Sequence, residues 1–272
     1  MDVMITALLL GALVGVVMGL TGAGGGILAV PLLVFGMPLT GMHLTVAEAG
    51  PIGLLAVGTS AAVGAMLGLK AKIVRYRAAL LVASSGILMA PLGVWLAHRL
   101  DTRLMSVLFA AVLGWVAYKT FSEIGGRHGK LKSERLTTPC IRDDTSSRFI
   151  WTSRCAGVLS LSGAVTGILS GLLGVGGGFV MVPALQRYTD LTVQSVVATS
   201  LAVISLVSLT GVAASISVGY FDWEIALPFA TGSVAGMGLG SMLTSRLPQK
   251  YPKLAFGFIC FVVAVGMILK SL

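Results

Sequence analysis

Residues 19–31 read GLTGAGGGILAVP, and residues 171–183 read GLLGVGGGFVMVP. Both stretches begin with Gly, carry four further glycines at the same offsets, and end in an apolar run followed by Val-Pro. A glycine in a helix interior is destabilising by about 1 kcal/mol relative to alanine. The doubled glycine cluster therefore indicates a chain built from two copies of one unit, each with a helix interrupted at the same place.

Each cluster predicts a break inside a membrane segment, after which a short helix starts near Ile27 or Phe179. The N-terminus of such a helix leaves backbone N–H groups without partners and carries a partial positive charge, which suits an anion. Interrupted helices at matching positions of two repeats are typical of the binding sites of secondary transporters. The alternative is that the glycines only let helix backbones approach closely. The predicted substrate-binding glycines are Gly22, Gly24, Gly25, Gly26, Gly174, Gly176, Gly177 and Gly178, and the predicted helix-breaking prolines are Pro31 and Pro183.

The composition is that of a membrane protein. Of the 272 residues, 56% are hydrophobic and 11% are charged, and the mean hydropathy is +0.96. Soluble domains carry about 25% charged residues. The first apolar run, residues 3–20, has no basic segment before it and no A-x-A cleavage site after it, which predicts a permanent span. We therefore expect an all-α polytopic membrane protein.

The apolar runs divide the chain into two transmembrane repeats of about five helical elements, residues 1–121 and 154–272, joined by a charged linker at 122–153. Beyond the glycines, Leu39-Thr40 matches Leu191-Thr192, and Ala61-Ala62 matches Ala213-Ala214. The runs at 27–37 and 179–185 are shorter than the roughly 20 residues that a span requires, which predicts half-helices.

The basic residues favour one topology. If each half crosses the membrane an odd number of times, the linker and nearly all Lys and Arg lie on one side, with Arg99, Arg103 and Lys270 on the other. Because cytoplasmic loops are rich in Lys and Arg, we expect inverted repeats with a cytoplasmic linker in a multi-pass membrane protein. Eight full spans in parallel repeats are the alternative.

The repeated GxGGGxxxVP, with Ala198-Thr199-Ser200-Leu201 downstream in the second half, resembles the sulfite exporter TauE/SafE family. The resemblance implies movement of sulfite, sulfonates or other small organic anions across the bacterial cytoplasmic membrane. It also makes Thr199 and Ser200 candidate substrate-binding residues. In the first half, Ala47-Glu48-Ala49-Gly50-Pro51 stands where the family usually has Ala-x-Thr-Ser, so any anion site is expected to be asymmetric.

Glu48 is the one acidic residue inside an apolar run and away from its ends. Its functional interpretation is a proton-coupling group, because a carboxyl group within the membrane is rarely kept without a role or a partner. The alternative is a local hydrogen bond near a helix start. We expect no basic residue inside an apolar run, so that helix N-termini and hydroxyl groups would bind the anion.

These observations favour a permease that works by alternating access, with an anion channel as the alternative and an intramembrane enzyme as a weaker one. The three histidines are scattered, which indicates no metal site and no catalytic residues. The cysteine count is odd (Cys140, Cys155 and Cys260), which indicates no disulfide framework and no thiolate metal site. No cofactor is expected, since a Walker A motif and a dinucleotide fingerprint are both absent from the sequence. The expected partners are a small anionic substrate, the lipid bilayer and, as an open possibility, a second copy of the chain, but no nucleic acid.

Overall fold

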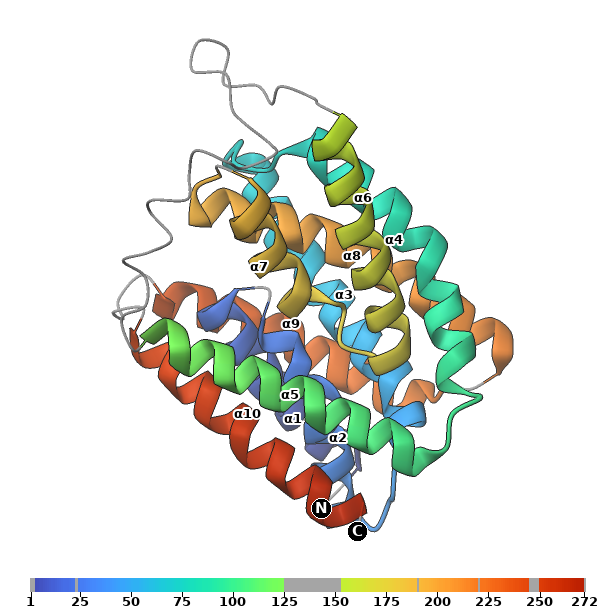
Figure 1. Ribbon diagram of the computed structural model, residues 1–272. Helices are drawn as coiled ribbons and strands as arrows, with labels where there is room; N and C mark the ends of the chain where they lie inside the picture. Colours follow the sequence, from blue (N-terminus) through green and yellow to red (C-terminus); the bar gives the residue numbers. More distant parts are fainter. Residues whose placement is uncertain are drawn as a thin grey trace.

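The computed structural model describes residues 3–22, 24–124, 153–189, 191–219, 221–244 and 250–271. Across these residues the chain forms ten α-helices, two short 3₁₀ helices and no strand (Figure 1). The first half contains α1 (Val3–Thr21), η1 (Gly25–Leu28), α2 (Ala29–Gly36), η2 (Met37–Thr40), α3 (Val46–Lys70), α4 (Tyr76–Ala97) and α5 (Thr102–Ile124). The second half contains α6 (Ser153–Leu173), α7 (Gly178–Tyr188), α8 (Val193–Val218), α9 (Trp223–Thr244) and α10 (Lys250–Ser271).

The prediction of an all-α polytopic membrane protein is confirmed. In the described part of the chain, seven helices (α1, α3, α4, α5, α6, α8 and α9) are long and apolar enough to cross a bilayer. Large apolar side chains such as Leu88, Leu209 and Met242 are more than 70% exposed on their surfaces. Soluble monomers rarely expose broad apolar surfaces, so this surface faces lipid.

The helices break at the glycines and not at the prolines. In the first half, α1 ends at Thr21 and η1 begins at Gly25; in the second half, α6 ends at Leu173 and α7 begins at Gly178. The prediction that Pro31 and Pro183 break helices is wrong, since Pro31 lies in the first turn of α2 and Pro183 lies inside α7. Proline is tolerated in a first turn because the N–H it lacks has no acceptor there. Positive φ angles at Gly22, Gly174, Gly176 and Gly177 turn the chain instead.

Two helix pairs are held together by glycine stripes. In the first pair, Gly11, Gly15 and Gly19 of α1 face the backbone of Phe229, Ser233 and Met237 of α9. In the second, Gly163, Gly167 and Gly171 of α6 face the backbone of Val82, Gly86 and Ala90 of α4. Small residues at every fourth position let helix backbones touch. In both pairs the residue numbers of the two helices increase in the same direction along the contact, so the helices of each pair are parallel.

The two halves run in opposite directions. Gly58 of α3 faces Ser208 of α8 and Gly68 faces Ala198, so these two corresponding helices are antiparallel. Figure 1 shows the same for α5 and α10, which pack side by side along one flank of the bundle. The pairing of α1 with α9 is matched by that of α6 with α4 when the halves are exchanged. This is the arrangement that inverted repeats produce, while the common origin of the halves stays a prediction.

One cysteine differs from the sequence expectation. Cys155, near the start of α6, is disulfide-bonded, and Cys260 on α10 is a buried free thiol. The sequence analysis, which argued only against a disulfide framework, did not anticipate this bond, because an odd count and wide spacing do not indicate which thiols meet in space. Cys140 and most of the linker lie outside the described residues.

Candidate functional site

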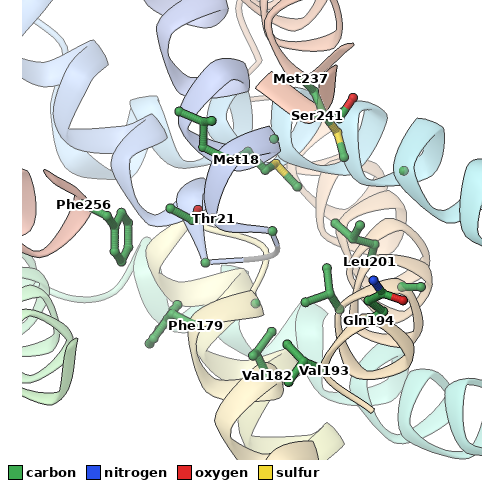
Figure 2. A pocket seen from close by; sticks show the side chains of 18 of the residues that line it. Met18, Thr21, Phe179, Val182, Val193, Gln194, Leu201, Met237, Ser241 and Phe256 are labelled. Carbon is green, nitrogen blue, oxygen red and sulfur yellow. The ribbon is translucent and has the colours of Figure 1, made fainter. Parts of the chain in front are cut away.

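A cavity of about 630 Å³ opens between the two halves. Its wall is formed where α1, α3, α5 and α9 end, where α8 and α10 begin, and along α7 from its first residue, Gly178, to Gln186. Figure 2 shows Phe179 and Phe256 on one side of the opening and Gln194 and Leu201 on the other. The volume lies within the range of small-molecule sites, about 300–1,000 Å³.

Most of the cavity lining is apolar, and several of its hydroxyl groups are already engaged. Thr21 donates to the carbonyl oxygen of Val17 at 2.7 Å, and Ser241 donates to that of Gly238 at 2.8 Å. The amides of Gln186 and Gln194 also line the cavity. An apolar pocket with a few polar groups orients a small ligand by those groups.

Two lysines line the cavity, and the sequence analysis missed both. Lys119, near the end of α5, has its ammonium nitrogen 5.2 Å from the centre of the Trp115 ring, and Lys253 lies in the first turn of α10. The expectation that no basic residue lies inside an apolar run is wrong, because Lys119 falls within the run that ends α5. A lysine near a span end keeps its charge in water by snorkelling. Two lysine side chains from α5 and α10 thus line the same cavity.

The predicted glycines divide into a lining set and a buried set. Gly22, Gly24 and Gly178 line the cavity. Beneath them lie Gly25, Gly26, Gly174, Gly176 and Gly177, which are buried. The two breaks meet there, because a Cβ atom built on Gly26 would lie 3.2 Å from the carbonyl oxygen of Val175. The structure thus brings the two clusters together deep between the halves.

The two breaks differ in the backbone donors they leave. At the first break, η1 leads directly into α2, and the N–H of Ile27 donates to the carbonyl oxygen of Gly24 at 3.4 Å. At the second break, Val180 and Met181 both donate to the carbonyl oxygen of Gly177. Within the described part of the chain, the N–H groups of Val175, Gly176 and Gly177 have no backbone acceptor. The two breaks therefore differ in local structure, since the first passes through a 3₁₀ helix and the second leads at once into the α-helix α7.

Thr199 and Ser200 are buried in α8 and do not line the cavity. The Oγ1 atom of Thr199 accepts a hydrogen bond from the backbone N–H of Arg75 at 3.2 Å. This bond ties α8 to the turn between α3 and α4. The Oγ atom of Ser200 is buried without a hydrogen-bond partner. A role for either residue in binding substrate stays a prediction.

Glu48 is exposed in the first turn of α3, where it completes a capping box with Thr45. Its carboxylate accepts hydrogen bonds from the N–H and the hydroxyl of Thr45 at 2.8 and 2.9 Å. It does not line the cavity. The geometry favours the local alternative, since a capping box satisfies donors that a helix start leaves open. Proton coupling by Glu48 stays a prediction.

Comparison with known proteins identifies the family. The model of the sulfite exporter TauE/SafE family matches residues 7–267. The chain belongs to this family. A probable membrane transporter protein of Xylella fastidiosa is 31% identical over 96% of this chain and 93% of its own length. The probable membrane transporter protein YunE of Bacillus subtilis is 24% identical over 97% of this chain and 96% of its own length. No solved structure matches this TauE/SafE chain.

Proposed function

We propose that this membrane transporter is a permease that moves a small sulfur-containing or organic anion, such as sulfite or a sulfonate, by alternating access. The observation that carries the proposal is the cavity, which combines Lys119 and Lys253 with the open N-terminus of α7 at Gly178. Both features favour negative charge. The printed name of the matching family, a sulfite exporter, supports the same substrate class.

The shape of the cavity supports a carrier over a channel. All of its lining residues belong to the linker end of the bundle or to the glycine breaks. At the opposite end, Gly174 packs against the backbone of Gly50, at the start of α3. A site that is open to one side and closed to the other is what alternating access requires. A channel would need a continuous path.

The orientation follows from charge. The end with the cavity holds the turn from Lys70 to Arg77, the linker and Lys253, whereas the opposite end holds Arg99 and Arg103. By the positive-inside rule, this end faces the cytoplasm, so we propose that the cavity opens to the cytoplasm. The disulfide at Cys155 lies at the same end and on its own favours an oxidising compartment. The charge distribution involves most of the basic residues and therefore outweighs a single disulfide. A membrane-impermeant maleimide applied to intact cells should label Asp222→Cys and spare Lys72→Cys, and the reverse pattern would invert the assignment.

Solute counterflow in proteoliposomes tests the function. Unlabelled sulfite, sulfonates or short carboxylates are loaded inside, and one radiolabelled member is supplied outside. Saturable accumulation driven by one anion class is the expected result. Uptake that never saturates, together with an anion conductance, would favour the channel, and exchange of none of these anions would exclude the proposed substrates.

Gly24→Leu is a suitable blocking variant. A Cβ atom on Gly24 would meet nothing closer than the Phe256 ring at 3.9 Å, and the φ of −77° suits any residue. The new side chain would therefore enter the cavity without distorting the fold. Gly114→Leu on α5 also adds a side chain in open space, but away from the cavity, and serves as the control. Counterflow should fall in the first variant and persist in the second.

A further inference from the structure

Three buried hydroxyl groups in the described part of the chain lack any hydrogen-bond partner: those of Ser170, Ser200 and Ser208. Serine and threonine in a membrane helix usually donate to a carbonyl group of the preceding turn. Ser215 shows the usual pattern on the same helix as Ser208, since it is fully buried and donates to the carbonyl oxygen of Gly211 at 2.9 Å. A buried unsatisfied hydroxyl costs about 1–3 kcal/mol, so these three groups require an explanation.

Ser208 lies against the second glycine break. Its Oγ atom would lie 3.3 Å from a Cβ atom built on Gly176, and its Cβ atom would lie 2.8 Å from one built on Gly58. The hydroxyl is therefore directed towards the break while the rest of the side chain packs on α3. Its relative exposure is 0%.

Ser170 lies on the other side of the same break. Thr166 of α6 contacts Gly177, and Ser170 follows Thr166 by four residues. Residues four apart share one face of a helix, so Ser170 lies on the face of α6 that is turned towards the break. Its backbone carbonyl oxygen accepts a hydrogen bond from the N–H of Gly174 at 2.9 Å. Two unsatisfied hydroxyls thus flank residues 174–177.

The backbone between these hydroxyls supplies further donors. In the described part of the chain, the N–H groups of Val175, Gly176 and Gly177 have no backbone acceptor, and α7 begins directly after them at Gly178. All of these N–H groups can only donate, and the serine hydroxyls can donate as well. A cluster of donors at a helix N-terminus matches an oxyanion and offers little to a cation.

The cluster lies on the continuation of the cavity. Leu201 of α8 lines the cavity, and Ile204 and Ser208 follow it at the spacing of one helix face. The side chains of Val57 and Ile204 pack against Gly176, and neither residue lines the cavity. A Cβ atom on Gly176 would lie 2.6 Å from Val57, so the cluster is closely packed in this conformation.

The geometry points to a second, deeper oxyanion subsite formed by the hydroxyls of Ser170 and Ser208 and by the N–H groups of Val175, Gly176 and Gly177. This inference rests on the proposed function. Lys119 and Lys253 receive the anion in the cavity, and its oxygens reach the deeper donors when the two halves move and Val57 and Ile204 separate. The preferred head group has several equivalent oxygens, as sulfite and sulfonates do, because the donors approach from two helices and a loop.

The test compares Ser208→Ala and Ser170→Ala with Ser215→Ala in the full chain. Thermal stabilisation by sulfite and by methanesulfonate measures binding in detergent, and counterflow measures transport. We expect Ser208→Ala to raise the half-saturating concentration about tenfold, the loss of one hydrogen bond to a charged group. In the absence of anion, the Ser208→Ala variant should unfold at the same temperature as the wild type or at a higher one, because the substitution removes no hydrogen bond. Ser215→Ala should show the opposite pattern, with lower stability and unchanged affinity.

The outcomes separate the subsite from the function on which it rests. If the wild type binds or exchanges neither anion, the proposed function fails and the subsite fails with it. If the wild type exchanges anions and both Ser170→Ala and Ser208→Ala keep its affinity, only the subsite is overturned. Should Ser208→Ala lose stability as Ser215→Ala does, its hydroxyl has a structural role, and Ser170→Ala then decides whether the break binds the anion.

Discussion

Gly174→Ala should shift the protein away from the conformation described here. Gly174 has a φ of +71°, and a left-handed conformation costs about 1–2 kcal/mol for an alanine. The new Cβ atom would also lie 2.7 Å from the backbone carbonyl carbon of Gly50. Overpacking of this kind costs about 1–3 kcal/mol. Because backbone atoms cannot rotate away, the contact is relieved only if the start of α3 separates from the end of α6.

Gly219→Ala is the matched control. Gly219 has a φ of +84° and no atom within 4 Å of a built Cβ atom, so alanine there meets the same backbone strain but no contact. The difference between the two variants isolates the contact with Gly50. A difference of about 1–3 kcal/mol corresponds to a shift of roughly 5- to 150-fold in a conformational equilibrium.

The assay is maleimide labelling of a reporter cysteine at Gln194, which lines the cavity, in a chain whose native cysteines are replaced. Separation at Gly50 opens the face opposite to the cavity, and alternating access then closes the cavity. Gly174→Ala should therefore slow labelling of Gln194→Cys, and Gly219→Ala should not. If both variants label at the same rate and unfold at the same temperature, the contact between Gly174 and Gly50 does not control access, and the reasoning fails.

Three further predictions follow from the site and the packing. Lys119→Gln combined with Lys253→Gln should raise the half-saturating anion concentration several-fold, with a smaller effect at high salt because exposed charges are screened. An unchanged half-saturating concentration in counterflow would show that the lysines only set topology. Gly15→Val should lower the free energy of unfolding by about 1–3 kcal/mol, because its side chain would meet the backbone of Ser233. Gly114→Val is the control, since a Cβ atom there meets no atom within 4 Å. Equal stabilities of the two variants in a denaturation assay would contradict the close packing of α1 on α9. Glu48→Gln should keep the pH profile of transport, and a profile altered by this substitution would instead support proton coupling. Glu48→Ala should lower the free energy of unfolding by about 0.5–1 kcal/mol through loss of the cap.

Pattern and composition predicted the fold class and the position of both breaks, because they depend on local properties. Glycine is the residue that tolerates a positive φ at low cost, so the clusters at 22–26 and 174–178 determine where the helices end. The effect of the prolines was not predictable in the same way. Pro183 lies inside α7, and membrane helices tolerate an internal proline where neighbouring groups can satisfy the freed backbone carbonyl.

The cavity itself depends on packing and could be predicted only in part. Gly22, Gly24 and Gly178 were predicted to bind substrate and do line the cavity. Lys119 and Lys253 come from two span ends that are far apart in sequence, and the pairing of α5 with α10 brings them to one cavity. One local signal was present, since Lys119 interrupts an otherwise apolar run. Thr45 before Glu48 was likewise a capping-box signature that could have been recognised.

The two halves are alike in arrangement but differ in the chemistry beside their breaks. In the register that matches Ala61-Ala62 with Ala213-Ala214, Ser170 corresponds to Met18 and Ser208 corresponds to Ala56. Both counterparts are apolar and buried. The first break passes through the 3₁₀ helix η1, whereas α7 begins directly after the second. If the proposed subsite binds the anion, the two hydroxyls therefore place most of the polar contacts on the second half, and substitutions at Met18 and Ala56 should affect anion affinity less than those at Ser170 and Ser208.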